Sequence, residues 1–363
     1  MKIDRDEKFT FNGLSDKESK NLAIFDLIKE KSIISRTDIS KDTGINMVSV
    51  SNYTKSFMDN GLLDDRGPDV STGGRKPELL EITTGGWGVL GISIDKDTAN
   101  VVLTDLASRL IEKRCSAAGD ALKLAEELCA AALTRGIKIK AVGIGFEGTE
   151  PASIFKDVGD VVKAPVFVGK KIYCAAFGER AFAINASHTG FLYVHSSLGE
   201  CVIIKDGELI SSSDEDRENI EYLRPWGGRL SAETMARDEI QKGVGTKIVH
   251  ITGTDLKKIT EDAVIEALKD GDEVAGGIIE SIGINLGLRI AYLMNVFAPK
   301  TIIIGGGIEK AGEALLSGVK RTIRRLAHSA KSKSISIAPS ALGPDGAALG
   351  ASALAVREIF LRS

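Results

Sequence analysis

The feature that most restricts the fold of this chain is a pair of short helical patterns separated by one glycine, within Ser35–Asn52. Ser35 with Asp38 three residues later matches a capping box, which starts a helix. Gly44 can adopt the left-handed conformation that turns the chain sharply after that helix. Asn46 can then cap the next helix by accepting a backbone N–H from its first turn. The pattern predicts two short helices joined by a tight turn.

Apolar residues on both sides extend this pair into a module of three helices followed by a β-hairpin. Residues 71–77, Ser-Thr-Gly-Gly-Arg-Lys-Pro, are typical of a hairpin ahead of an apolar strand at 79–82. This order is typical of a winged helix-turn-helix, which places one helix in the DNA major groove and a β-hairpin beside it. The positions expected to face inward at helical spacing are Leu22, Ile24, Phe25, Leu27, Ile28, Val50, Tyr53 and Phe57.

This module supplies candidate DNA-contacting residues on its second and third helices and on its hairpin. The segment from Asn46 to Lys55 is expected to enter the major groove, and Arg75 to reach the minor groove or its phosphates. A solvent-exposed turn residue is the simpler alternative for Arg75, and an ordinary three-helix packing module is the alternative for the whole segment. The candidate set is Ser35, Arg36, Asn46, Met47, Ser49, Ser51, Asn52, Lys55, Arg75 and Lys76.

Charge limits how tightly such a module binds DNA without sequence recognition. Residues 1–82 carry about as many acidic as basic side chains, where a basic face is usual. We therefore expect modest non-specific affinity, and binding to double-stranded DNA that depends on two copies of the module. Two modules related by a dimer axis read half-sites of opposite orientation, so the expected operator is an inverted repeat.

The whole chain has 363 residues, 43% of them hydrophobic, which suits two or three domains. No apolar run reaches the roughly 18 to 20 residues that span a bilayer, and the polar N-terminus lacks a signal-peptide core. We therefore expect a cytoplasmic protein with no membrane partner. Its four cysteines are scattered, without metal-ligand or disulfide spacing, and are expected to be reduced. They are Cys115, Cys129, Cys174 and Cys201.

From residue 88 onward, strand and helix patterns alternate. Val89–Ile94 and Ala99–Thr104 predict a β-hairpin around a polar turn. The alternation predicts an α/β fold whose halves are two lobes around a cleft. Further strands are expected at 142–146, 191–194, 202–209 and 301–304, and helices at 121–133, at 275–297 and after the glycines 305–307.

Six matching segments follow one another along the chain: Ser35–Asn52, Gly73–Pro77, Leu90–Ile94, Pro165–Val168 with Ala175–Glu179, Ile302–Ile308 and Leu342–Ala351. Together they resemble the ROK family (repressor, open reading frame, kinase), in the branch with a winged helix-turn-helix ahead of a sugar-kinase-type domain. The resemblance implies a DNA-binding domain at 1–85 and a two-lobed, actin-like ATPase (ROK) fold at 86–363. It also implies a homodimer and transcriptional control of genes often tied to carbohydrate metabolism.

The chain departs from active kinases of that family at the phosphate-binding turns and at the catalytic base. The first turn reads Ser93-Ile-Asp-Lys-Asp97, so carboxylates stand where phosphate needs open glycine backbone. The second reads Ser197-Leu-Gly-Glu200, which adds another carboxylate. In place of the general-base Asp there are Lys170 and Lys171, which we interpret as a solvated pair, and an ammonium does not accept the sugar proton. The resemblance therefore implies that phosphoryl transfer is lost.

The zinc site of the family is also missing. The corresponding segment, residues 218–228, contains neither Cys nor His, so a tetrahedral site cannot form there. We expect no metal and no cofactor.

We interpret the chain as a non-enzymatic, DNA-binding transcriptional regulator, a repressor, whose kinase-like domain serves dimerisation and effector binding. The alternatives are a sugar kinase with a DNA-binding appendage and an interaction scaffold. The mixed charges of the expected effector cleft favour a polar or anionic compound over an unmodified sugar, and a closed, salt-bridged cleft without ligand is the alternative. Arg321, Arg324 and Arg325 predict a basic helical face, which is usually solvated. The effector candidates are Glu147, Lys170, Lys171, Ser197 and Glu200.

Overall fold

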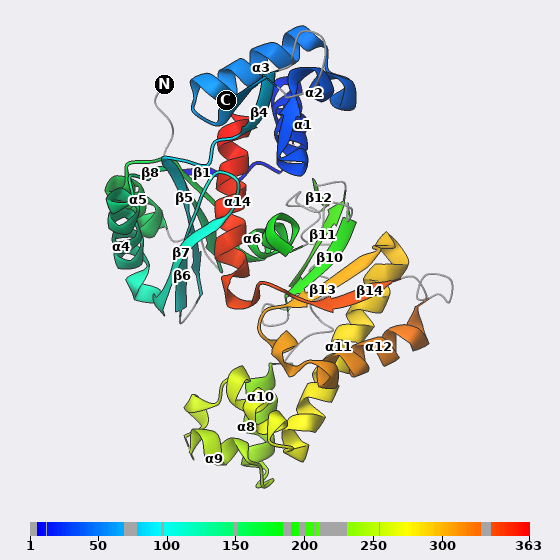
Figure 1. The fold of residues 1–363 in the computed structure, drawn as a ribbon. Coiled ribbons are helices and arrows are strands. Elements are labelled where there is room, and N and C mark those ends of the chain that lie inside the picture. Colours follow the sequence, from blue (N-terminus) through cyan, green and yellow to red (C-terminus); the bar gives the residue numbers. More distant parts are fainter. Residues whose placement is uncertain are drawn as a thin grey trace. The chain divides into compact units, whose positions relative to one another are not determined.

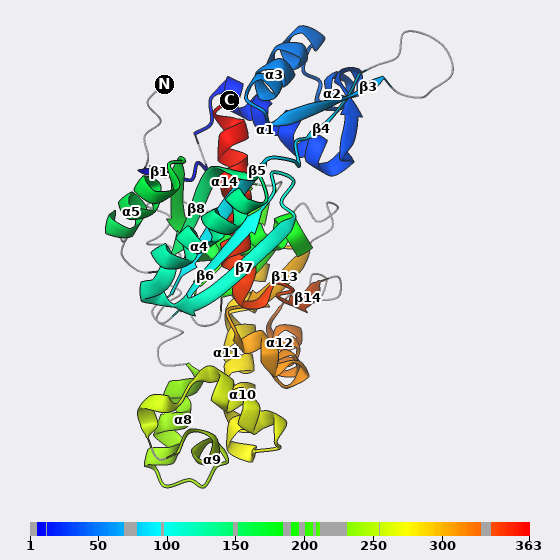
Figure 2. The ribbon, with the colours of Figure 1, turned by 60° about the vertical axis from the view of Figure 1, so that its left-hand side comes forward.

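The computed structural model divides the chain into two compact units. The first comprises residues 1–186 and 345–363, and the second residues 187–344. Figures 1 and 2 show the elements of each unit. The structure describes residues 6–11, 13–68, 78–95, 98–147, 152–183, 190–195, 200–205, 208–210, 231–253, 255–327 and 335–363.

A three-helix module with a small antiparallel sheet, in the order β2-β4-β3, confirms the winged helix-turn-helix. Ser35 caps α2 by accepting the backbone N–H of Asp38, and Gly44 ends α2 in the left-handed conformation at φ 72°. Asn46 caps α3, as the sequence indicated. The elements are α1 (Asp16–Lys31), β2 (Ile33–Ser35), α2 (Arg36–Thr43), α3 (Met47–Asp59), β3 (Leu63–Pro68) and β4 (Glu78–Ile82).

The core of this module differs from the expected set at one position on α3. Val50 and Phe57 are fully buried, as predicted. Tyr53 is only half-buried, and Thr54 is fully buried in its place. The Thr54 hydroxyl donates to the carbonyl of Val50 at 2.8 Å, so its burial leaves no polar group unsatisfied. A hydroxyl bonded inside its own helix explains why a polar residue replaced the predicted aromatic.

A six-stranded sheet, in the order β1-β9-β8-β5-β6-β7, forms the rest of the first unit. Helices α4 and α5 cover one face, and α6 and α14 cover the other (Figure 1). Gly91 and Gly143 allow α14 to approach, because a Cβ at either position would lie 2.0 Å from a carbonyl oxygen of α14. The elements are β1 (Asp6–Lys8), β5 (Trp87–Ile94), β6 (Thr98–Thr104), β7 (Leu110–Ala117), α4 (Ala121–Thr134), β8 (Lys138–Phe146), α5 (Ala152–Val162), β9 (Val166–Lys170), α6 (Lys171–Gly178), the π-helical turn η2 (Glu179–Ala183) and α14 (Gly346–Leu361).

The first strand of this sheet comes from the segment that precedes the DNA-binding module. β1 pairs in parallel with β9, with Asp6 opposite Val166. Phe9 is buried against Gly169, where a Cβ would lie 2.6 Å from its ring. Residues 6–8 therefore belong to the sheet, and Phe9 packs beside it. The sequence analysis did not predict this strand, because three residues carry too little pattern.

The second unit contains a five-stranded sheet, in the order β12-β11-β10-β13-β14. Its helices α11 and α12 pack closely through Gly283 and Gly287 of α11 and Gly318 of α12. Among the described helices, α11 is long and apolar enough to cross a bilayer, but half of its most apolar stretch is buried within the unit, as in a core helix. The elements are β10 (Gly190–His195), β11 (Glu200–Lys205), β12 (Glu208–Ile210), α8 (Ala232–Gln241), α9 (Ile248–Thr252), α10 (Glu261–Lys269), α11 (Glu273–Phe297), β13 (Thr301–Gly305), α12 (Glu313–Leu326) and β14 (Ser336–Pro339).

Candidate nucleic-acid interface and the carboxyl edge of the first sheet

Helix α3 presents a contiguous exposed face opposite its buried side. Val48, Asn52 and Lys55 follow one another at i, i+4 and i+7, and all three are exposed. Met47 beside them is 44% exposed and Val48 is 72% exposed. Asn46 accepts the backbone N–H of residue 49 at 2.9 Å, which fixes the start of the helix. Side chains of this size and polarity can reach base edges if the helix enters a groove.

Two of the candidate DNA contacts do not reach this face. Ser35 is only 2% exposed, and its hydroxyl donates to Asp38 Oδ2 at 2.6 Å. Ser35 is therefore a helix cap, and its inclusion among the DNA contacts was wrong. The Arg36 guanidinium donates to Thr54 Oγ1 at 3.1 Å and forms an ion pair with Glu78 of β4. Arg36 therefore holds α2 against α3 and the small sheet.

The structure adds one residue to the candidate interface and leaves two undescribed. Val48 escaped the sequence analysis because an apolar helical residue is normally assigned to a core. Its i, i+4 relation to Asn52 was the available signal, and a valine side chain can contact a thymine methyl group. Ser49 and Ser51 are half-buried beside the exposed face. Arg75 and Lys76 lie outside the described residues.

The C-terminal helix α14 ends against α1 and α3 (Figure 1). Phe360 packs between Phe25 of α1 and Phe57 of α3, with ring centroids 4.4 and 5.1 Å apart. Lys140 of β8 donates to the carbonyl of Asn60, just after α3, at 2.7 Å. The DNA-binding module is thus attached to the six-stranded sheet and α14 through α1 and the C-terminal end of α3.

A buried carboxylate lies where α14 contacts the segment that precedes α1. Glu358 of α14 is fully buried and accepts the backbone N–H of Thr10 at 2.6 Å and the Thr10 hydroxyl at 3.1 Å. Arg362 Nε donates to the same carboxylate at 3.1 Å, and Arg357 Nη1 lies 3.4 Å away. Burial raises the pKa of Glu358 to about 7, although the hydrogen bonds from Thr10 and the Arg357 charge act in the opposite direction.

The carboxyl ends of β5, β8 and β9 bring together several residues expected at a phosphoryl-transfer site. The three strands are parallel neighbours, and the register aligns their last residues. Asp95, Glu147 and Lys171 directly follow the three strands, and Lys170 ends the third. These side chains therefore start from one edge of the sheet, where ligands bind in open α/β folds. Three effector candidates, Glu147, Lys170 and Lys171, share this edge.

At this edge Lys171 forms an ion pair with Asp95. The Lys171 side chain is 12% exposed and that of Asp95 is 26% exposed, so our expectation of a solvated lysine pair is wrong for Lys171. Asp95 is held in its turn by Thr98, whose hydroxyl donates to Asp95 Oδ2 at 3.2 Å. The pair joins two segments that the family resemblance implied to be the general-base position and the first phosphate turn. It also neutralises part of the repulsion that we expected Asp95 to exert on phosphate.

The remaining candidates fall in or beside segments that the structure does not describe. Ser197, Asp97 and residues 218–228 lie outside the described residues, and Glu200 begins β11 in the second unit. Among the described residues, no three His, Cys, Asp or Glu side chains gather to hold a metal ion. The four cysteines are free thiols, as expected, and burial raises the pKa of Cys129 to about 11.

Comparison with known proteins shows similarity to one family and to a set of repressors. A family model described as ROK family matches residues 241–358. The chain is 24% identical to the xylose repressor of Caldicellulosiruptor bescii, covering 95% of this chain and 97% of that protein. It is 23% identical to the DNA-binding transcriptional dual regulator NagC of Escherichia coli K12, covering 95% and 94%. The chain is therefore similar to the ROK family over residues 241–358, and similar over nearly its whole length to transcriptional repressors.

Solved structures show the same fold. The crystal structure of a ROK family transcriptional regulator, described as a homologue of the E. coli MLC protein, matches with a TM-score of 0.72 at 19% identity and covers 96% of this chain and 99% of its own. A ROK family glucokinase from Streptomyces griseus matches with a TM-score of 0.60 at 21% identity and covers 74% of this chain and 99% of its own. The regulator spans the N-terminal module as well, and this agrees with a winged helix-turn-helix joined to a kinase-type fold.

Proposed function

We propose that this protein is a transcriptional repressor that binds double-stranded DNA through α3. The observation that carries the proposal is the exposed face of Met47, Val48, Asn52 and Lys55 on a helix whose cap and preceding turn follow the helix-turn-helix pattern. Similarity over 95% of the chain to the xylose repressor and to NagC supports it, because that span includes this module. Such a protein acts in the cytoplasm, where bacterial DNA is found.

The chemistry of α3 assigns different roles to its exposed residues. The amide of Asn52 matches the donor and acceptor pattern of adenine in the major groove. Lys55, one turn further along, suits a phosphate contact, which positions the helix without reading sequence. Arg75 and Lys76 of the wing remain proposed contacts to the minor groove or its phosphates. Asn52 is thus the proposed specificity residue.

A homodimer follows from the expected inverted-repeat operator, and α11 offers a surface for it. Ile284, Tyr292 and Val296 recur every fourth or eighth residue on one side of α11 and are 41%, 57% and 56% exposed. Phe297 at the end of the helix is 41% exposed. Contiguous exposed apolar and aromatic side chains of this kind mark protein interfaces. We therefore propose that two copies of the second unit associate through α11.

We further propose that the kinase-like domain does not catalyse phosphoryl transfer. The Asp95–Lys171 ion pair occupies the first phosphate turn and the position of the general base, and phosphoryl transfer depends on positioning at those places. The variant Lys171→Asp should accordingly remain inactive towards ATP and hexoses, because it sets two carboxylates side by side. ATP-dependent phosphorylation of a hexose by the unaltered protein would instead establish the kinase alternative.

The same edge is the proposed effector site. A ligand with an anionic or strongly polar group can compete with Asp95 for Lys171, with Glu147 and Lys170 beside it. To regulate, it must bind the DNA-competent and DNA-incompetent states with different affinity. The names of the relatives suggest a link to carbohydrate metabolism. Thermal-shift screening of sugar phosphates, sugar acids and free sugars tests the chemical class of the effector. A ligand whose affinity is unchanged by Lys171→Ala would place the effector site elsewhere.

The DNA proposal is tested by the affinity of Asn52→Ala for genomic fragments retained by the unaltered protein. A side chain that reads a base contributes about 1–3 kcal/mol, so affinity should fall by roughly ten-fold to a hundred-fold. Lys123→Ala removes an exposed side chain from α4 in the same unit and serves as the matched control. Equal affinity of Asn52→Ala and the control would show that α3 does not read this DNA.

A further inference from the structure

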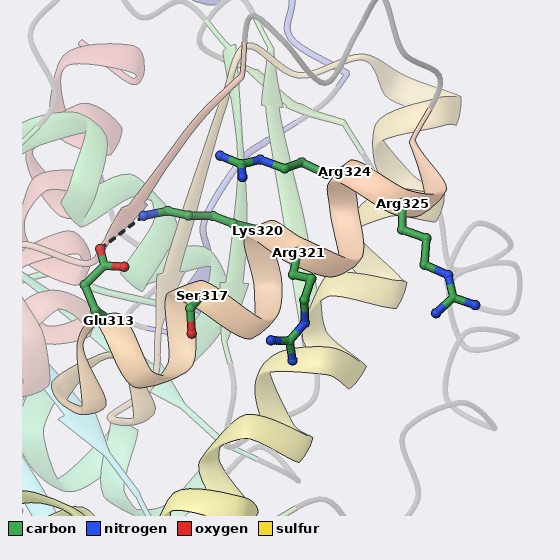
Figure 3. Close-up of a pocket in the computed structure, with 6 residues that line it drawn as sticks. All are labelled: Glu313, Ser317, Lys320, Arg321, Arg324 and Arg325. Atoms are coloured by element: carbon green, nitrogen blue, oxygen red, sulfur yellow. Dashed lines mark hydrogen bonds and ion pairs between the residues drawn. The ribbon is translucent and has the colours of Figure 1, made fainter.

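One helix of the second unit carries an exposed cluster of cations. Lys320, Arg321, Arg324 and Arg325 of α12 line an open hollow of about 560 Å³ together with Glu313 and Ser317 (Figure 3). In Figure 3, Lys320 and Arg324 extend to one side of the helix, and Arg325 extends to the other. The apolar positions of the helix face the core, so this polar side is a surface and not a packing contact. We call these four cations the α12 basic face.

Only half of the α12 basic face is neutralised. Lys320 forms an ion pair with Glu313 at 3.1 Å, and Arg321 forms one with Glu280 of α11 at 2.5 Å. Within the described part of the chain, neither Arg324 nor Arg325 has an acidic side chain at ion-pair distance. The dipole at the end of α12 stabilises cations in the last turn. That effect explains the positions of Arg324 and Arg325. It does not explain Lys320 and Arg321 before them or Lys331 and Lys333 after them.

The sequence after Glu313 of α12 carries basic side chains and no acidic ones up to residue 344. No Asp or Glu occurs between Glu313 and Asp345, whereas Lys331 and Lys333 follow the helix. The whole chain has a net charge of −3, so this segment runs against the overall composition. The DNA-binding module shows the opposite, because over residues 1–82 Lys and Arg do not outnumber Asp and Glu. The cations of residues 314–344 are therefore not balanced by acidic residues within that segment, whereas the cations of residues 1–82 are.

We propose that the α12 basic face binds the sugar-phosphate backbone of duplex DNA as a second, sequence-independent contact. This inference rests on the proposed function, which already brings duplex DNA to the protein. Phosphate contacts supply most of the non-specific affinity of DNA-binding proteins, and α3 offers one lysine for that purpose. Arginine suits the role because its planar guanidinium donates two parallel hydrogen bonds to phosphate oxygens. The α12 basic face sets the overall affinity for duplex DNA, and α3 determines which DNA sequence is preferred.

The test compares Arg324→Ala/Arg325→Ala with Lys257→Ala/Lys258→Ala, which removes the same charge from an exposed part of the same unit. The probe is a random-sequence duplex, titrated between about 50 and 200 mM salt. Each phosphate contact contributes about 0.9 to the slope of log affinity against log salt, so the arginine variant should lose roughly 1.8 from the slope. The affinity advantage of the unaltered protein over the arginine variant should therefore shrink roughly tenfold between the lower and the higher salt, while the control variant keeps its slope and affinity close to those of the unaltered protein.

Equal slopes and affinities for the two variants would overturn the proposal. Binding of poly-glutamate that depends on Arg324 and Arg325, with unchanged DNA binding, would also overturn it and would identify an acidic protein as the partner. The unaltered protein and Asn52→Ala are measured on retained genomic fragments in the same series. If the unaltered protein retains no fragment, the proposed function itself fails. If fragments are retained in an Asn52-dependent way and the arginine variant behaves as the control, only the α12 assignment fails.

Discussion

The α2–α3 module and the carboxyl edge of β5, β8 and β9 belong to the same compact unit. They differ in whether they have the side chains, as well as the backbone, of the class of protein that they resemble. The module retains both its backbone and the side chains its class needs: a capping Asn46, a left-handed Gly44 and an exposed face around Asn52. The sheet edge has the parallel strands of the kinase fold, and we propose that the ion pair between Asp95 and Lys171 stands where phosphate and base would act in a kinase. The two regions show that a shared fold does not by itself imply a shared function, because function depends on the side chains of the site.

The largest expected effect comes from weakening the packing of α14 against the DNA-binding module. Phe360 is fully buried between Phe25 and Phe57, so Phe360→Ala should lower the free energy of unfolding of the first unit by about 3–5 kcal/mol. Chemical denaturation measures this free energy of unfolding. Leu110→Ala, at a position 46% exposed in the same unit, should change the free energy by less than about 0.5 kcal/mol. A Phe360→Ala effect as small as the control's would mean that the module and the sheet are not held together by α14.

The pH dependence of the same junction gives a second, somewhat smaller effect. The pKa of Glu358 is about 7 in the folded protein against an ordinary value of 4.5. The folded state therefore binds this proton more tightly than the unfolded state does. The resulting stability is fully present below about pH 4.5 and is lost as the pH rises through about 7. A shift of this size corresponds to an effect on the order of 3 kcal/mol.

Glu358→Gln should remove this part of the pH dependence. The measurement is the difference in free energy of unfolding between the unaltered protein and the variant at pH values on either side of the folded pKa. Glu127→Gln, on the solvent-exposed side of α4, is the control and should leave the profile unchanged. Parallel pH profiles for the unaltered protein and Glu358→Gln would show that the Thr10 hydrogen bonds and the neighbouring arginines keep Glu358 charged throughout.

The smallest expected effect concerns the ion pair at the sheet edge. Lys171→Met leaves Asp95 without its cation, and Asp95→Asn leaves Lys171 without its anion. A double-mutant cycle of these changes should give a coupling free energy of about 1 kcal/mol, because the pair is partly screened by water. Additive single effects would show that the ion pair does not form in solution. The edge would then be more open to phosphate than we propose.

Much of the fold was accessible from sequence because its signals are local. Ser35, Gly44 and Asn46 marked the helix ends, and the structure confirms all three. The hairpin of β5 and β6 and the long helix α11 followed from their apolar periodicity. Strand β1 was missed because its three residues owe their conformation to β9, which is far away in the sequence. Tertiary contact decides such short elements, and local propensity does not.

The candidate sites were harder to predict because they depend on which side chains meet. The opposite charges of Asp95 and Lys171 were visible in the sequence, but their pairing followed from the register of three parallel strands. Arg36 was among the candidate DNA contacts, and in the structure its guanidinium contacts Thr54 and Glu78. Residue type restricted the possible roles, and tertiary structure chose among them.

The most direct test of the central claim is a footprint of the purified protein across its own genome. We predict that it protects an inverted repeat at a small number of promoters, with half-site centres about 10–10.5 base pairs apart or a multiple of that spacing. Protection should be lost in Asn52→Ala and kept in Lys171→Met, because the first changes the DNA-reading face and the second changes only the sheet edge. Binding without discrete protected sites, or protection that survives Asn52→Ala, would contradict the assignment of this protein as a repressor that reads DNA through α3.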